Sequence, residues 1–184
     1  MFNSIKNFII ACYKPEHLFW TNVIIGALLM FLGEIIAQTI MITAGRRSPI
    51  YSKKKIFQAA IIGLVLNSYQ HFYYLWVDNL YSKVSVTNTL KKVILDEIFI
   101  APSSVFGFFM LTGIFETFSI YGGIDKVKQH FVPVFLCDLL FFPTVQFVNF
   151  QFVPQKLRMN YISFVTILWN TFLCFTDHDH DQVA

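Results

Sequence analysis

Five long segments of the chain carry almost no charge, and this pattern constrains the fold more than any other feature. Glu34 is the only formally charged residue between His17 and Arg46. A helix needs about 20 apolar residues to cross the hydrocarbon core of a bilayer. Inside that core each backbone amide must bond within the protein, which a helix achieves locally. The candidate spans are residues 20–44, 56–77, 98–115 and 131–153, with a further candidate at 159–176.

The sequence therefore predicts an all-α integral membrane protein built as a bundle of four transmembrane helices. Residues 159–176 form a fifth, C-terminal helix that either spans the membrane or packs against the bundle at its interface. The composition agrees, because 55% of the residues are hydrophobic and only 14% are charged, against about 25% charged in a soluble domain. The spans use most of the 184 residues, so we expect a single multi-pass membrane domain over residues 1–184.

Several polar side chains lie inside the apolar segments, where they are costly and usually face other helices or a cavity. In the second segment Ala59, Gly63, Asn67 and His71 recur every four residues, which places small and polar side chains on one stripe. Such residues either form hydrogen bonds between helices or line a pore, and both interpretations stay open. The candidate residues are Glu34, Gln38, Asn67, His71, Gln146 and Asn149.

A basic loop follows the first predicted span. It contains Arg46, Arg47, Lys53, Lys54 and Lys55. These charges suit contact with anionic lipid headgroups, and the alternative is contact with RNA phosphates. The net charge of the chain is only +3, and we expect no DNA partner.

No motif in the sequence predicts catalysis. The chain has no Walker loop, no GxGxxG, no GxSxG and no HExxH. The three cysteines form no CxxC pair, and His178 and His180 are too few ligands for a fixed metal site. We therefore expect no enzyme activity, no cofactor and no metal.

The segment from Phe142 to Pro154, together with Arg158 and a later Trp-Asn pair, resembles a family signature. The family is that of Mpv17 and the twenty-two-kilodalton peroxisomal membrane protein. Its pattern reads Trp-Pro-x-x-Gln-x-x-Asn-Phe-x-x-Val-Pro-x-x-x-Arg, followed by Trp-Asn or Trp-Asp. The matching residues are Pro143, Gln146, Asn149, Phe150, Val153, Pro154, Arg158, Trp169 and Asn170.

Shorter matches upstream extend the resemblance over about residues 18–175. Gly33-Glu34 with Gln38 is similar to the Gly-Asp-x-x-x-Gln of the family's first span. The chain departs from the pattern at Phe142, where the family has Trp, and at Asn67-Ser68, where it has Gly-Pro. The residues of the signature resemble most closely those of the branch called Mpv17-like protein 2.

The resemblance implies a small protein with four membrane helices in the mitochondrial inner membrane, or alternatively in the peroxisomal membrane. It implies one of two functions. The first is support of mitochondrial ribosome assembly and matrix homeostasis, and the alternative is a channel for passive passage of small solutes. The expected partners are the lipid bilayer, mitochondrial ribosomal subunits and, as an open alternative, further copies of the chain.

Overall fold

The computed structural model describes residues 11–45 and 50–180, except for the side chains of residues 170 and 173–180. Arg46 and Arg47 of the predicted basic loop lie outside the described residues, as does the side chain of Asn170. The described ranges are helical and contain no strand, which confirms the predicted all-α class. The elements are α2 (Pro15–Thr43), α3 (Lys53–Leu80), α4 (Val86–Leu95), the π-helix η1 (Asp96–Ile100), α5 (Ala101–Thr117), α6 (Ile120–Phe152), the 3-10 helix η2 (Gln155–Leu157) and α7 (Arg158–His180).

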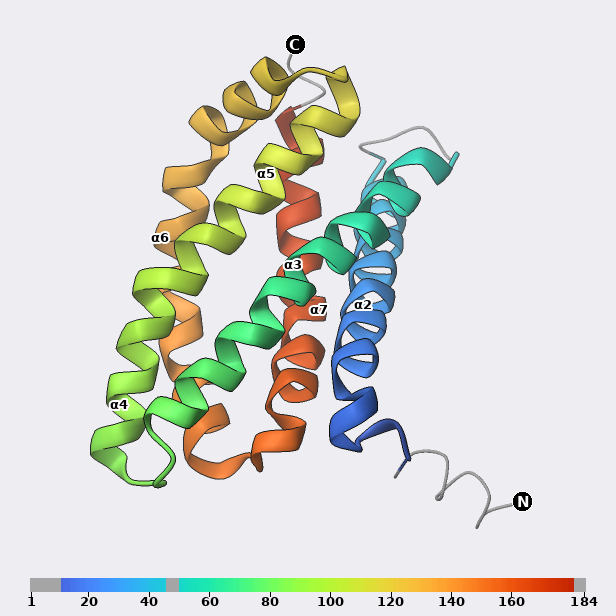
Figure 1. Ribbon diagram of the computed structural model, residues 1–184. Coiled ribbons are helices and arrows are strands. Elements are labelled where there is room, and N and C mark those ends of the chain that lie inside the picture. The colour runs from blue at the N-terminus through green and yellow to red at the C-terminus, as the bar shows by residue number, and fades with distance from the viewer. Residues whose placement is uncertain (1–10, 46–49, 181–184) are drawn as a thin grey trace.

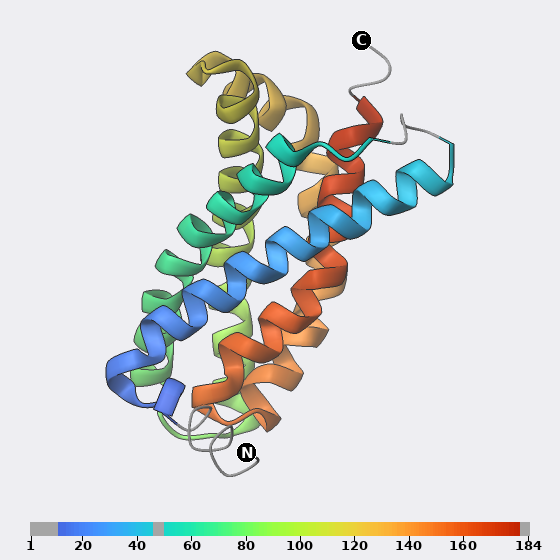
Figure 2. The same ribbon diagram turned by 90° about the vertical axis from the view of Figure 1, so that its right-hand side faces the viewer.

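The long helices alternate in direction along the bundle (Figure 1). Helix α3 is antiparallel to α2, and the continuous α4–η1–α5 helix is antiparallel to α3. Helix α6 is antiparallel to α5, and α7 is antiparallel to α6. The same arrangement is seen from the side (Figure 2). Helix α2 packs against α3 and α7, while α5 packs against α6. We call the end with the α2–α3 and α5–α6 connections the first end, and the end with the α3–α4 and α6–α7 connections the second end.

Local sequence explains where the helices begin and end. Serine hydroxyls cap the N-termini of three helices, because they accept bonds from backbone N–H groups that lack a helical partner. Ser52 accepts from Lys55 at 3.3 Å, Ser85 from Asn88 at 3.2 Å and Ser119 from Tyr121 at 3.2 Å. Helix α5 ends where Phe118 adopts a left-handed backbone conformation, with φ of 53°. This geometry turns the chain directly into α6.

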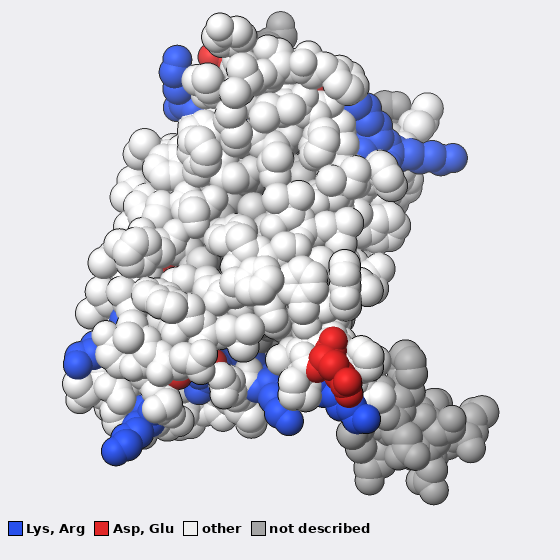
Figure 3. Space-filling model, in the orientation of Figure 1, with Lys and Arg blue, Asp and Glu red and all other residues white. Residues whose placement is uncertain are grey.

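Three helices are long and apolar enough to cross a membrane, among the described residues. They are Pro15–Thr43, Val86–Thr117 and Ile120–Phe152. Helix α3 has 28 residues, but polar side chains such as Asn67 and His71 in its second half lower its mean hydropathy. The count of four spans therefore stays a prediction. Lys and Arg gather at the two ends of the visible face, and the broad band between them is almost uncharged (Figure 3).

The small residues predicted on the second span permit close helix packing. A Cβ atom on Gly63 would lie 2.9 Å from the Ala27 Cα and 2.9 Å from the Met30 Cβ, both in α2. One turn later, the Asn67 side chain fills the space beside Gly26, where a Cβ would lie 2.1 Å from its Cγ. The absence of a side chain at both glycines lets α2 and α3 approach closely, as small residues do in membrane bundles.

Candidate functional site

A largely apolar cavity with several polar side chains in its wall lies between the helices, and all of the long helices contribute to it. Its volume is about 80 Å³, which is room for several water molecules. Gly26 and Met30 of α2, Ser104 and Phe108 of α5, and Ser163 of α7 line it. The other polar lining residues are Asn67, Gln70, Tyr74, Asp96, Asp138, Gln146 and Thr166.

A π-turn places Asp96 against this cavity. The N–H of Ala101 donates to the Asp96 carbonyl five residues earlier, so the helix widens over Asp96–Ile100. Such turns are frequent at functional sites because they rotate the following residues relative to an unbroken helix. The Asp96 carboxylate is 2% exposed, and its Oδ2 accepts a bond of 2.8 Å from Gln146. Its Oδ1 is buried with no hydrogen-bond partner among the described residues.

Gln146 connects three elements at the cavity wall. Its Nε2 donates to the Tyr74 hydroxyl of α3 at 2.5 Å as well as to Asp96. Its Oε1 accepts from the Asn149 amide at 3.1 Å. The signature residues Gln146 and Asn149 thus hold the Asp96 carboxylate in one orientation, because both Nε2 and Oε1 of the Gln146 amide are engaged.

Asp138 is the second carboxylate of the cavity. It lies on α6, two helical turns before Gln146, and is 5% exposed. Its Oδ2 is also buried without a hydrogen-bond partner in the part of the chain that the structure describes. Sequence reasoning did not select Asp96 or Asp138. The available signal was position, since Asp138 is the only charged residue of residues 131–155 and Asp96 stands at the start of a span.

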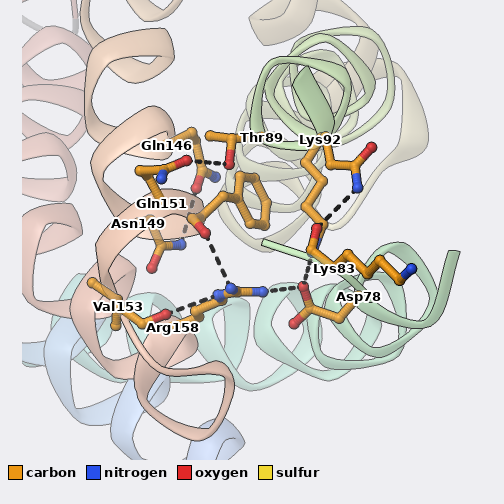
Figure 4. Close-up of polar contacts among 11 residues, drawn as sticks. Asp78, Lys83, Thr89, Lys92, Gln146, Asn149, Gln151, Val153 and Arg158 are labelled. Atoms are coloured by element: carbon orange, nitrogen blue, oxygen red, sulfur yellow. Dashed lines mark hydrogen bonds and ion pairs between the residues drawn. The ribbon is translucent and has the colours of Figure 1, made fainter. Parts of the chain in front are cut away.

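A buried ion cluster closes the second end of the bundle (Figure 4). Asp78 at the end of α3 accepts from Lys92 Nζ of α4 at 2.5 Å and from Arg158 Nη1 of α7. The three side chains are only 5–6% exposed. Lys92 Nζ and the Arg158 guanidinium each lie 5.5 Å from the centre of the Phe150 ring, where the ring face attracts cations.

Arg158 also explains part of the family signature. The Phe150 carbonyl would accept from residue 154 in a continued helix, but Pro154 has no N–H to donate. Arg158 Nη2 donates to this carbonyl instead at 3.1 Å, and Nε donates to the Val153 carbonyl at 3.1 Å. The arginine therefore satisfies the open end of α6 while it binds Asp78 (Figure 4).

The six predicted polar residues fall into three places. Asn67 and Gln146 line the central cavity, and Asn149 supports Gln146. His71 lies outside the cavity, where its Nδ1 is 3.1 Å from the Asn22 amide of α2.

Glu34 and Gln38 lie toward the first end. Gln38 Nε2 donates to Glu34 Oε1 at 2.6 Å, and Gln38 Oε1 accepts from the Ser52 N–H at 2.7 Å. Glu34 borders a separate, smaller cavity of about 20 Å³ beside Lys55 and Glu116. The predicted residues therefore do not share one cavity. Most of them lie at contacts between helices, and the acidic side chains that line the central cavity are two other residues, Asp96 and Asp138.

The predicted basic loop is only partly described. Lys53 and Lys54 are exposed at the first end, while Lys55 is half-buried and pairs with Glu116 at 3.2 Å. Lys126 of α6 binds the same carboxylate at 2.7 Å. Lys55 therefore joins α3 to α5, and the described cations of this loop that face outward are Lys53 and Lys54.

Comparison with known proteins identifies relatives over most of the chain. The model of the family described as "Mpv17 / PMP22 family" matches residues 113–174, a stretch that includes Asp138 and the signature. The chain is 26% identical to "Mitochondrial inner membrane protein Mpv17" of Rattus norvegicus, over 88% of this chain and 92% of that protein. It is 23% identical to "PXMP2/4 family protein 4" of Dictyostelium discoideum (87% and 86%) and 26% identical to "Protein SYM1" of Saccharomyces cerevisiae (84% and 81%). No solved structure matches the chain.

Proposed function

From its similarity to the Mpv17 / PMP22 family, we propose that the chain is a mitochondrial inner-membrane protein whose central cavity passes small polar solutes. The location follows the printed name of the rat relative, and the peroxisomal membrane is the alternative. All of the long helices in one copy of the chain contribute residues to the cavity wall. A homo-oligomer is therefore not required for this function. Association of further copies of the chain stays a prediction.

The observation that carries the proposal is a pair of buried acidic residues in the wall of a cavity between apolar helices, each with one oxygen atom that has no hydrogen-bond partner among the described residues. Asp96 Oδ1 and Asp138 Oδ2 are buried and have no partner among the described protein atoms. Each such atom costs about 1–3 kcal/mol when nothing binds to it. A chain that places several of them inside a bilayer gains from water or a polar solute in the cavity, and intramembrane acids characteristically mark solute pathways.

Obstruction of the cavity tests this function. Ser104 borders the cavity, while its neighbour Ser103 is exposed at the edge of α5, with its hydroxyl 3.1 Å from that of Tyr69 in α3. In liposomes that contain the purified protein, Ser104→Phe is expected to abolish glycerol efflux, because the ring fills the cavity. Ser103→Phe adds the same ring on the lipid side and is expected to leave efflux unchanged.

Two results would contradict the proposal. One is wild-type efflux no faster than that of empty liposomes. The other is equal efflux from both phenylalanine variants when both retain the helical circular dichroism of the wild type.

Support of mitochondrial ribosome assembly is the second candidate function, and the exposed cations of the first end favour it. Lys53 and Lys54 project from the start of α3, where they can neutralise phosphates of RNA. Replacement of both by Gln is expected to weaken co-sedimentation with ribosomal subunits and to flatten its salt dependence. Lys83→Gln with Lys91→Gln removes two exposed cations from the second end and serves as the matched control. Identical co-sedimentation of both double variants would remove the first end as the ribosomal contact.

A further inference from the structure

We propose that the central cavity binds a small primary ammonium ion, held by Asp96 and Asp138, with its carbon chain against the aromatic wall. This inference rests on the proposed function and names the class of solute. It can also be tested by binding alone, without transport.

The titratable side chains that line the cavity are acidic. Its described lining includes two carboxylates and no Lys, Arg or His. Glu97 follows Asp96 on the π-turn, and both of its carboxylate oxygens are buried without partners within the described ranges. Lys92 lies one helical turn before Asp96, but its ammonium group donates to Asp78. A buried carboxyl group is stable in its charged form only beside a counter-charge, and a cation bound in the cavity would supply it.

The free acceptors suit a donor with several N–H groups. Gln146 occupies Asp96 Oδ2, so Oδ1 is the oxygen left to accept a bond. Asp138 Oδ2 is the second free acceptor. A primary ammonium group has three donors and can therefore serve more than one acceptor, whereas a quaternary ammonium has none. A neutral alcohol can donate only one bond and brings no charge.

The remainder of the wall suits carbon better than a metal ion. No group of three or more His, Cys, Asp or Glu side chains is placed to hold a metal within the described ranges. A calcium ion takes 6–8 oxygen ligands, and the cavity instead presents Phe108, Phe142 and Trp169. The Phe142 and Trp169 rings meet edge to face, with centroids 5.1 Å apart. Aromatic faces attract ammonium groups and cover alkyl chains.

The volume limits the ligand to a few heavy atoms. A cavity of about 80 Å³ accepts ethanolammonium, which has four non-hydrogen atoms. Propan-1-ol has the same number of heavy atoms and differs in the replacement of the ammonium group by a methyl group. The pair therefore isolates the contribution of the charge and its donors at constant size.

Equilibrium dialysis of radiolabelled ethanolammonium against the full-length protein in lipid nanodiscs tests the inference. We expect saturable binding of ethanolammonium and its displacement by propylammonium. Propan-1-ol is expected not to displace it. A 100-fold excess of K⁺, which represents the metal alternative, is also expected not to displace it. Asp138→Asn is expected to weaken binding at least about tenfold, because it removes one charge from a buried pair. Glu34→Gln makes the same change in the separate cavity of the first end and is expected to leave binding unchanged.

The wild-type protein alone can overturn the inference, whatever the variants do to folding. Absence of saturable binding, or displacement by propan-1-ol as effective as by propylammonium, would refute it. So would equal loss of binding in Asp138→Asn and Glu34→Gln. If glycerol crosses while ethanolammonium does not bind, the inference falls and the proposed function stands. If ethanolammonium binds but no solute crosses, the proposed function falls and the site stands.

Discussion

The ion cluster of Asp78, Lys92 and Arg158 makes a specific prediction about stability. One carboxylate here faces two cations, and all three side chains are 5–6% exposed. Either cation alone can neutralise Asp78, but without Asp78 two buried cations would face each other over Phe150. We therefore expect Asp78→Asn to be the most damaging single substitution in the cluster.

The hydrogen bonds of the cluster set the magnitudes. Asp78→Asn leaves buried charge without compensation, and it is expected to lower the free energy of unfolding by about 3–5 kcal/mol. Arg158→Met leaves a neutral Asp78–Lys92 pair but removes the hydrogen-bond donor of the Phe150 carbonyl. Pro154 cannot replace this donor, because it has no N–H. The expected cost of Arg158→Met is about 2–3 kcal/mol, because it leaves the buried Phe150 carbonyl without a donor and also removes the Arg158 bonds to Asp78 and to the Val153 carbonyl. Lys92→Met leaves the Arg158 contacts intact, and its expected cost is about 1–2 kcal/mol.

Reversible unfolding in mixed detergent micelles, followed by helical circular dichroism, measures these differences. The exposed neighbour Lys156→Met is the control and is expected to change stability by less than about 0.5 kcal/mol. The double variant Asp78→Asn with Lys92→Met is expected to be more stable than Asp78→Asn alone, because it removes one of the two uncompensated cations. Lys92→Met as damaging as Asp78→Asn, or a double variant whose losses simply add, would refute this account of the cluster.

Three further predictions follow from the packing, the backbone and the membrane location. Gly63→Ala is expected to lower the free energy of unfolding by about 1–3 kcal/mol, because its Cβ would meet the Ala27 backbone at 2.9 Å. Gly107→Ala is expected to cost less, because its Cβ would meet only the end of the Leu66 side chain at 2.9 Å. Equal losses of stability in the same unfolding assay would contradict this prediction. Phe118→Gly is expected to raise stability by about 0.5–1 kcal/mol, since φ of 53° is unfavourable for a side-chain-bearing residue, and a lower midpoint would argue against strain there. Carbonate extraction of mitochondria is expected to leave the protein in the membrane pellet, and its release as a soluble protein would contradict the membrane fold.

The sequence by itself determined the class of the fold, because lipid restricts the choices. Long apolar segments in a bilayer must form helices that satisfy their own backbone, and the described residues are helical as expected. The four-residue recurrence of small and polar side chains likewise marked the face of α3 that meets α2, since helical periodicity depends only on position along the chain. The helices extend further than the charge pattern suggested, because α6 begins at Ile120, whereas the predicted span begins at residue 131.

The tertiary structure alone decided which polar residues meet. Glu34, His71 and Gln146 all lie on inward faces, yet they belong to three separate places, because depth along each helix and the crossing of the helices set their neighbours. Residues 80 positions apart in the sequence, Asp78 and Arg158, share one bond. The π-turn at Asp96 shifts the following residues by an amount that apolar periodicity does not reveal. The cavity and its two carboxylates are therefore a product of packing between helices, whereas the helices themselves are a product of the local sequence in lipid.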